Sequence, residues 1–123
     1  MERQTRQRGA IRRAFQRAGR PLSPAEVLAD ARRDVGGLGI ATVYRNIRAL
    51  LDEGWLVAVD LPGEASRYEL AGREHHHHFR CRRCEQVYDV DCTVGSLEAA
   101  VPKGFQLERH DIVLHGTCDT CAS

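Results

Sequence analysis

The spacing of apolar residues in the first half of the chain predicts three helices. Residues 5–18 place their apolar side chains at helical intervals, and a Gly-Arg-Pro sequence ends this segment. A second helix is predicted over 24–33, because Ser23-Pro24-Ala25-Glu26 supplies an N-cap, a proline in the first turn and a glutamate three residues after the cap. After a glycine-rich turn, a third apolar stripe predicts a helix over 40–53.

The pattern then changes to one typical of strands. Residues 55–60 and 66–70 flank a Pro-Gly turn and predict a β-hairpin. Three helices followed by a two-stranded wing form a winged helix-turn-helix domain. In the rear half the pattern predicts two short strands, a short helix and a longer strand, over residues 77–80, 87–90, 93–100 and 105–115 respectively.

These elements predict an α+β chain built in two parts. We expect a winged helix-turn-helix domain over residues 1–71 and a small C-terminal α/β domain with an antiparallel sheet over residues 72–123. Because the 123 residues are shared between two parts, each part buries little core. A bound metal would therefore be a useful stabiliser in at least one of them.

Charge is distributed unevenly along the chain. Residues 1–50 carry eleven Arg and four Asp or Glu, whereas residues 51–123 carry seven Lys or Arg and thirteen Asp or Glu. A basic front half favours a polyanionic partner such as nucleic acid. No apolar run approaches the ~20 residues of a membrane span, and no secretory signal is visible. We therefore expect a cytoplasmic protein without membrane association.

Four of the five cysteines form two Cys-x-x-Cys pairs, Cys81 with Cys84 and Cys118 with Cys121. Two such pairs can close a tetrahedral zinc site, because the two-residue gap lets both sulfurs reach one ion. A thioredoxin-like redox site would need one pair at a helix start in a βαβ unit, which is not predicted here. A zinc deaminase would need an open metal position and a His-x-Glu motif, and none occurs. We expect structural zinc and no enzymatic activity.

Four consecutive histidines, His75 to His78, precede the first cysteine pair. A purification tag or a solvated cluster would give the same composition, but tags are usually terminal and longer. In an extended strand, His75 and His77 point one way and His76 and His78 the other. This alternation predicts two separate metal sites beside the structural zinc.

Taken in order, these motifs resemble the ferric uptake regulator (Fur) family of metal-responsive bacterial repressors over nearly the whole chain. The resemblance rests on Thr5-Arg6-Gln7-Arg8, Ala41-Thr42-Val43-Tyr44-Arg45, Arg67-Tyr68-Glu69, the histidine run with Cys81-x-x-Cys84, and His110 with Gly116-Thr117-Cys118-x-x-Cys121. It implies a homodimer whose winged-helix domains read a palindromic operator in double-stranded DNA. The C-terminal domains would pair the protomers, and a regulatory metal near the hinge would set the relative pose of the two domains.

Matched to the family residue by residue, the two histidine pairs are implied to belong to different sites. The regulatory site at the hinge would use Glu69, His76, His78 and Asp89. A second site would use His75, His77, His110 and an acidic residue of the short helix, Glu98. The metals implied are structural Zn2+ and a regulatory Fe2+, Zn2+ or Mn2+.

Two departures from the family bear on the metal that is sensed. Many relatives have a ligand histidine before the second helix, where this chain has Pro21. The chain is also shorter between Cys84 and Gly104, so that Glu98 is an inexact match. Cys92 is either a small apolar-like residue without a role or an extra ligand of the hinge site, where its thiolate would favour Zn(II).

The start of the third helix is where recognition helices meet base edges. There, Tyr44 could pack on a thymine methyl, and Arg45 could reach phosphate or guanine. Further candidates are Asn46 and Arg48 on the same helix, and Arg6, Arg8 and Arg12 on the first helix as phosphate contacts. We expect a metal-dependent repressor. The alternatives are a zinc- or peroxide-sensing relative, or a constitutive DNA-binding protein whose metal sites are permanently filled.

Overall fold

The computed structural model describes residues 2–93, 95 and 97–122, and these residues form an α+β chain. The chain divides into two compact units, Met1–Arg73 and Glu74–Ser123. The boundary expected after residue 71 lies two residues before this division. Among the described residues, no helix is both long and apolar enough to cross a membrane.

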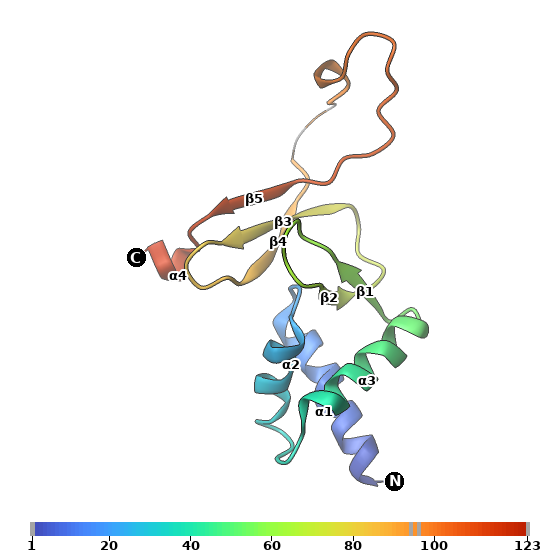
Figure 1. Cartoon of the computed structure of the whole chain (residues 1–123), viewed down its shortest axis with the longest axis vertical. Helices are drawn as coiled ribbons and strands as arrows, with labels where there is room; N and C mark the ends of the chain where they lie inside the picture. The colour runs from blue at the N-terminus through green and yellow to red at the C-terminus, as the bar shows by residue number, and fades with distance from the viewer. Residues whose placement is uncertain (1, 94, 96, 123) are drawn as a thin grey trace. The chain divides into compact units, whose positions relative to one another are not determined.

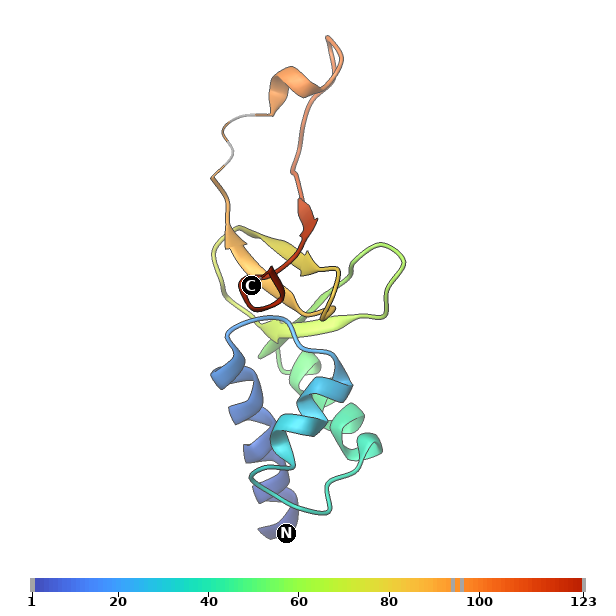
Figure 2. The same cartoon turned by 90° about the vertical axis from the view of Figure 1, so that its left-hand side faces the viewer.

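The first unit is a three-helix group followed by a hairpin (Figures 1 and 2). Its elements are α1 (Glu2–Ala18), α2 (Pro24–Ala31), α3 (Ile40–Asp52), β1 (Leu56–Val59) and β2 (Arg67–Leu70). Helix α2 begins with the predicted capping box: the backbone N–H of Glu26 donates to the Ser23 hydroxyl, and the Ser23 N–H donates to the Glu26 carboxylate. β1 and β2 pair antiparallel. The predicted winged helix-turn-helix arrangement is therefore confirmed.

The core of this unit is formed by the apolar stripes of the three helices. Its fully buried side chains include Ile11, Phe15, Val27, Val43 and Leu50. Ile11 and Phe15 are four positions apart and Val43 and Leu50 are seven apart, which is the spacing that turns one face of a helix towards a core. The amphipathic pattern of the sequence thus decided which residues are buried.

The second unit contains a three-stranded sheet in the order β4-β3-β5. The strands are β3 (His76–Cys81), β4 (Val87–Asp91) and β5 (Val113–Gly116), and a short helix α4 (Asp119–Ala122) follows. β4 runs antiparallel to β3, as expected, but β5 runs parallel to it. The sheet is therefore mixed, and the expectation of an antiparallel sheet fails for β5 alone. The long connection from β4 to β5 permits the parallel pairing, since a parallel neighbour needs a crossover of about a dozen residues or more.

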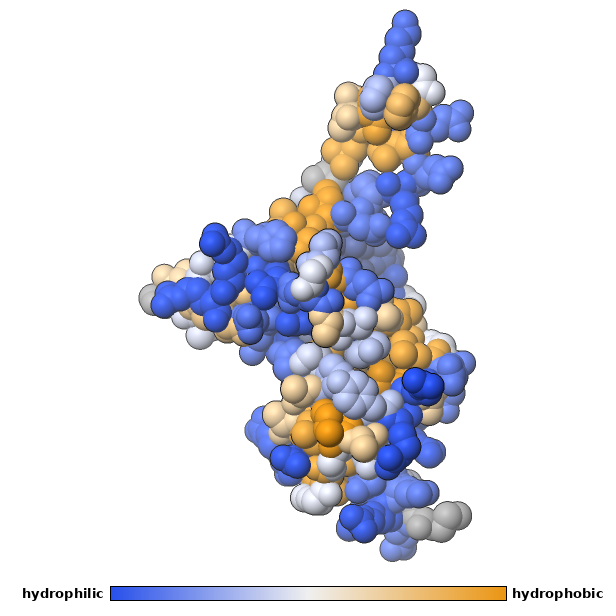
Figure 3. Space-filling model, viewed as in Figure 1, coloured by the Kyte–Doolittle hydropathy of each residue, from blue (hydrophilic) through white to orange (hydrophobic). Residues whose placement is uncertain are grey.

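The segment between β4 and β5 differs from the prediction. Of the strand predicted over 105–115, only residues 113–115 pair in a ladder, as part of β5, which continues to Gly116. β3 begins at His76 and offers little backbone for earlier residues to pair with. Of the predicted helix over 93–100, Glu98–Ala100 forms a 3-10 turn, while residues 94 and 96 lie outside the described residues. Figure 1 draws the segment as a loop leaving the sheet, and Figure 3 shows apolar side chains gathered on it. Phe105, which is 67% exposed, belongs to this segment.

Candidate metal centres and DNA-facing helix

The topology of the second unit brings metal-ligating side chains together at both ends of its sheet. β3 starts at the end where β4 finishes, because those strands are antiparallel. β5 also starts at that end, because it runs parallel to β3. One end of the sheet therefore gathers three sets of residues: those just before β3, those just after β4 and those just before β5. The opposite end gathers the residues just after β3, just before β4 and just after β5.

The cysteines of the two Cys-x-x-Cys pairs, here called the knuckle cysteines, form one of these groups. The ligand atoms of Cys81, Cys84, Cys118 and Cys121 all lie within 4.8 Å of one another. The Sγ atoms of Cys84 and Cys118 are 3.9 Å apart. Four sulfurs at about 2.3 Å from a zinc ion would be separated by about 3.8 Å in a tetrahedron. The donor set and its spacing therefore fit a structural zinc ion, which these four residues would hold as thiolates.

Backbone hydrogen bonds prepare Cys81 for the thiolate form. The N–H groups of Cys84 and Cys118 donate to its Sγ atom at 3.5 and 3.4 Å. These bonds lower the pKa of Cys81 to about 6. Hydrogen bonding to the Cys118 sulfur raises the pKa of Cys121 to about 12. Without a cation the cluster holds some of its protons, and a bound zinc ion would take their place.

The turn between the first two of these cysteines is closed by backbone bonds. The N–H of Glu85 donates to the carbonyl of Cys81, and the N–H of Cys81 donates to the carbonyl of Gln86, both at 3.0 Å. Glu85 has a φ of 64°, in the left-handed region that side chains disfavour. The tight turn presents both sulfurs to one point, and this backbone strain accompanies it.

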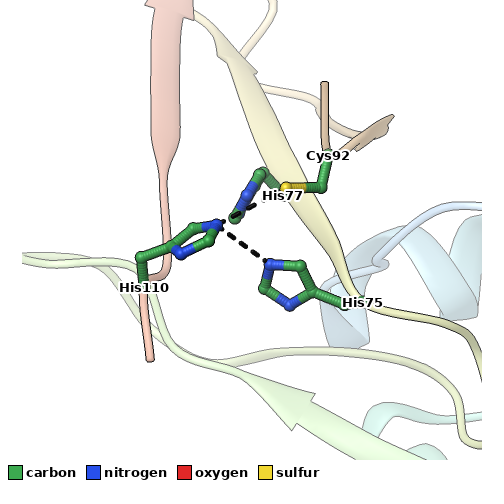
Figure 4. A group of neighbouring side chains, drawn as sticks. All are labelled: His75, His77, Cys92 and His110. Atoms are coloured by element: carbon green, nitrogen blue, oxygen red, sulfur yellow. Dashed lines mark hydrogen bonds between the residues drawn. The ribbon is translucent and has the colours of Figure 1, made fainter. Parts of the chain in front are cut away.

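A second group lies at the opposite end of the sheet and is shown in Figure 4. It comprises His75, His77, Cys92 and His110, whose ligand atoms lie within 4.8 Å of one another. The Nε2 atom of His110 is 3.2 Å from Nε2 of His75 and 3.4 Å from Sγ of Cys92. His110 thus stands between the other two side chains, at hydrogen-bond distance from each.

His77 is the buried member of this group, with 3% of its surface exposed. Its Nδ1 atom accepts a hydrogen bond of 3.1 Å from the N–H of Ile112, and its buried Nε2 atom has no hydrogen-bond partner among the described residues. Burial lowers the pKa of His77, and the neighbouring His75 and His110 act in the same direction. While Nδ1 accepts this bond, the neutral ring carries its proton on Nε2. A cation would thus bind His77 in one of two ways. Either the ring first rotates by half a turn about its Cβ–Cγ bond, or the cation binds at Nδ1 and replaces the hydrogen bond from Ile112.

The fourth member of this group differs from the residue expected. The family resemblance implied Glu98 for this position, and Cys92 was expected either to have no role or to join the hinge site. Instead, Cys92 directly follows β4 and joins the histidines, whereas Glu98 lies in the 3-10 turn and is absent from the metal-ligand groups of the described residues. The family resemblance had already implied His110 for this group. The position of Cys92 just after the strand predicted over 87–90 was visible in the sequence, but its proximity to His110 depends on the strand pairing.

The other two histidines of the run lie with Asp89 on β4. His78 and Asp89 are paired residues of the antiparallel ladder. The Nε2 atoms of His76 and His78 are 3.4 and 3.3 Å from the Oδ1 atom of Asp89. One carboxylate oxygen thus stands between two imidazole nitrogens, and these three side chains could share a divalent cation. Glu69 lies on β2 of the first unit.

Pro21 is buried in the first unit and cannot ligate a metal. The next residue, Leu22, forms an antiparallel bridge with Tyr68, with backbone bonds of 2.8 and 2.9 Å in both directions. This register places Pro21 opposite Glu69. A histidine at position 21 would therefore stand beside the Glu69 carboxylate. Because the side chain of proline has no ligand atom, Glu69 is the member of this pair whose side chain can bind a metal.

Helix α3 presents several of the predicted DNA contacts to solvent. Tyr44 is 54% exposed, and Arg45 and Arg48 are also exposed. The Arg45 guanidinium donates to the Thr42 hydroxyl at 2.9 Å, a contact that orients its side chain. Sequence reasoning missed this role of Thr42, although the three-residue spacing on a helix allows it. A pocket between α1 and α3 is lined by polar residues that include Arg8, Arg45 and Asn46.

Some arginines of α1 form hydrogen bonds with acidic side chains of the first unit, and others are exposed to solvent. Arg12 donates to Glu53 at 3.4 Å and lies over the Trp55 ring, 5.4 Å from its centroid. Arg13 and Arg17 both donate to Asp34 at 3.2 Å and hold the pKa of that carboxyl below its usual value. Arg6 and Arg8 are exposed. Arg12 therefore has a packing role that the sequence did not reveal.

Comparison with known proteins agrees with this arrangement. The sequence profile of the ferric uptake regulator family matches residues 2–115. Ferric uptake regulation protein 2 of Mycolicibacterium fortuitum is 30% identical over 123 aligned positions, which cover 96% of this chain and 84% of that protein. The solved structure of the Helicobacter pylori ferric uptake regulator is described as revealing three functional metal binding sites. It aligns with 95% of this chain and 82% of its own chain, at 28% sequence identity and a TM-score of 0.65.

A zinc-bound manganese uptake regulator is 26% identical with a TM-score of 0.77, over 91% of this chain and 87% of its own. The similarity thus extends over both units. The chain belongs to the ferric uptake regulator family of metal-responsive, DNA-binding transcription regulators.

Proposed function

We propose that this chain is a cytoplasmic, homodimeric repressor that binds a palindromic operator in double-stranded DNA when a regulatory metal is bound. The observation that carries the proposal is the convergence of His76, His78 and Asp89 on adjacent strands. Two imidazoles and a carboxylate suit Fe2+, Zn2+ and Mn2+ to different degrees. They leave room in the coordination shell for a ligand from elsewhere in the chain.

Glu69 is our candidate for that ligand. It is carried by β2 of the wing, whereas the other three ligands are carried by β3 and β4 of the second unit. A metal bound by all four would link the DNA-binding unit to the metal-binding unit. Such an ion stabilises whichever pose brings the ligands together, so that it shifts the population towards one arrangement of the recognition helices.

The proposed contacts with DNA come from the two helices that line the polar pocket. Tyr44, Arg45, Asn46 and Arg48 of α3 would face base edges and nearby phosphates, and Arg6 and Arg8 of α1 would contact phosphates. The side chain of Arg12 would contribute less to DNA binding, since it is engaged by Glu53 and Trp55. In a twofold dimer the two α3 helices would enter successive major grooves of a palindrome.

The test is DNA binding measured by fluorescence anisotropy on reduced protein stripped of loosely held metal. The operator is first obtained by random-sequence selection, and Fe(II), Mn(II) and Zn(II) are then titrated separately. We expect retention of one tightly bound zinc per chain and a rise in affinity of at least ~10-fold with the cognate metal, which corresponds to about 1.4 kcal/mol of coupling. Loss of DNA binding when peroxide is added to the iron-loaded form would identify peroxide as the signal.

Matched variants separate sensing from folding. His76→Gln and Glu69→Gln should each abolish the response to metal while the structural zinc is retained. His115→Gln is the control, because this exposed histidine of β5 belongs to none of the three groups among the described residues. Tight operator binding that is the same with and without every added metal would reject the sensing mechanism and leave a constitutive DNA-binding protein.

A further inference from the structure

The group formed by His75, His77, Cys92 and His110 contains a sulfur where an oxygen ligand was expected. The four residues come from three places far apart in the sequence: the start of β3, just after β4 and the approach to β5. Strand topology, and not local sequence, brings them together. Figure 4 shows the Cys92 sulfur and the His75 ring both directed at the His110 ring.

Two of the distances within this group match the edges of a small tetrahedron. Nitrogens at about 2.0 Å and sulfur at about 2.3 Å from a zinc ion would be about 3.3 Å apart for an N–N edge and about 3.5 Å for an N–S edge. The observed separations are 3.2 Å between the Nε2 atoms of His75 and His110, and 3.4 Å between Nε2 of His110 and Sγ of Cys92. His110 is thus at the spacing from both His75 and Cys92 that one ion would impose, and the ligand atoms of all four residues lie within 4.8 Å of one another.

His77 is the fourth candidate ligand. It is 3% exposed, and its buried Nε2 atom lacks a hydrogen-bond partner among the described residues. A buried ring nitrogen without a partner carries a free-energy cost. That cost would be removed if the ring bound a cation in exchange for its bond with Ile112. Its ring centroid lies 4.6 Å from that of His75 and 5.0 Å from that of His110, so that it faces the same space.

We propose that Cys92 supplies a thiolate to this group, which makes it a four-coordinate site for Zn(II) in preference to Fe(II) or Mn(II). The thiolate and three imidazoles are ligands of the type that zinc prefers, and they are poorly suited to manganese, which favours carboxylates and water. The bound cation replaces the thiol proton of Cys92, which passes to solvent. This inference extends the proposed function. It rests on that function in one respect, namely that the chain binds metal in addition to the structural zinc.

The experiment uses Co(II) as a spectroscopic substitute for zinc in the full chain, under reducing conditions, with zinc already filling the four knuckle cysteines. Because those cysteines are occupied and the His76, His78 and Asp89 group contains no sulfur, any thiolate-to-cobalt charge-transfer band reports Cys92. We expect a band from one thiolate per chain, with the structural zinc retained. The band should be absent in Cys92→Ser, and His110→Gln should weaken the cobalt binding that produces it by at least ~10-fold.

Two further variants make the test selective. His115→Gln should leave the band and its titration unchanged, as a matched histidine control outside the group. Cys92→Glu should retain metal binding, lose the band and raise the relative affinity for Mn(II), since a carboxylate replaces the thiolate. A zinc-retaining chain that binds Co(II) without the band would overturn the proposal. So would a band that survives in Cys92→Ser, or cobalt binding that depends on Glu98 and is indifferent to Cys92.

These readouts do not involve DNA, so the two proposals can fail separately. A charge-transfer band in a chain whose operator affinity ignores metal would reject the sensing function and leave the Cys92 site standing. A metal-dependent rise in operator affinity in a chain that binds Co(II) without the thiolate band would keep the sensing function and reject the Cys92 site.

Discussion

Gly116, at the end of β5, shows how a single residue limits the packing beside the zinc knuckles. A Cβ atom at this position would lie 3.0 Å from Cζ and 3.3 Å from Cε2 of Phe79 on the neighbouring strand. The carbonyl of Gly116 also accepts a hydrogen bond of 2.7 Å from the N–H of Arg82. An added methyl group would therefore require the half-buried Phe79 ring or the backbone to give way by a few tenths of an ångström.

Gly116→Ala should therefore lower the free energy of unfolding of the zinc-loaded chain by about 1 kcal/mol, as expected for modest overpacking. Urea unfolding measures this change. Adding Phe79→Leu should recover part of the loss by making room for the methyl group. Gly36→Ala is the control, because nothing lies within 4 Å of its added Cβ. Equal effects of the two glycine substitutions would contradict the steric explanation.

Arg12 and Arg8 lie one turn apart on α1 and should have different roles. Arg12→Ala should lower the stability of the first unit by about 0.5–1 kcal/mol, since it removes the contact with the Trp55 ring. Arg8→Ala should leave stability unchanged and weaken operator binding, with a smaller dependence of affinity on salt. Thermal unfolding and anisotropy at several salt concentrations distinguish the two. If Arg12→Ala reduced the salt dependence as much as Arg8→Ala, Arg12 would be a phosphate contact.

At the scale of elements, the turn between β3 and β4 both presents cysteine sulfurs for metal binding and requires an unusual backbone conformation. The N–H groups of Cys84, in the turn, and of Cys118 both donate to the Cys81 sulfur, and the turn requires a left-handed residue immediately after Cys84. That residue is Glu85, whose side chain makes an exposed contact of 3.5 Å with Arg80. Exposed ion pairs of this kind contribute little to stability.

Glu85→Gly should consequently stabilise the zinc-loaded chain by about 1 kcal/mol, because glycine adopts a positive φ without the steric cost of a side chain. Denaturant unfolding provides the measurement. Glu85→Ala is the matched comparison: it removes the same ion pair but keeps the Cβ atom, so it should bring no gain. A stabilisation of the same size in the alanine variant would show that removal of the charge, and not relief of strain, is responsible.

At the scale of the whole molecule, the two units depend on different sources of stability. The first has a continuous apolar core drawn from its three helices. In the second, the described residues that are buried and apolar are few, and Cys81 and Cys118 are among them. Zinc held by four cysteines would join the end of β3 and the turn that follows it to the C-terminal segment. The free energy of metal binding would then be part of the folding free energy.

Removal of the structural zinc with a strong chelator should unfold the second unit and leave the first folded. Amide hydrogen exchange should lose protection in β3 and β4 while α1, α2 and α3 keep theirs, since local stability follows the interactions within each unit. Restoring zinc under reducing conditions should restore protection. Simultaneous loss of protection in the helices would show that the two units unfold as one.

Much of this protein follows from its sequence alone, because the information is local. The period of apolar residues determined the three helices, and Ser23 and Glu26 marked the start of α2. The alternation of side chains along a strand was sufficient to separate His75 and His77 from His76 and His78. The two-residue spacing within each cysteine pair likewise indicated a common ion, because it lets both sulfurs of a pair reach one point.

Tertiary structure decided the features that depend on which strand lies beside which. The parallel alignment of β5 with β3 brings His110 to the end of the sheet where Cys92 leaves β4. No periodicity reports that alignment, because a crossover of about twenty residues leaves strand order and direction undetermined by local pattern. Glu98 was therefore the reasonable expectation from sequence, and Cys92 emerged only from the fold. The same holds for Arg12, whose partners lie far along the chain.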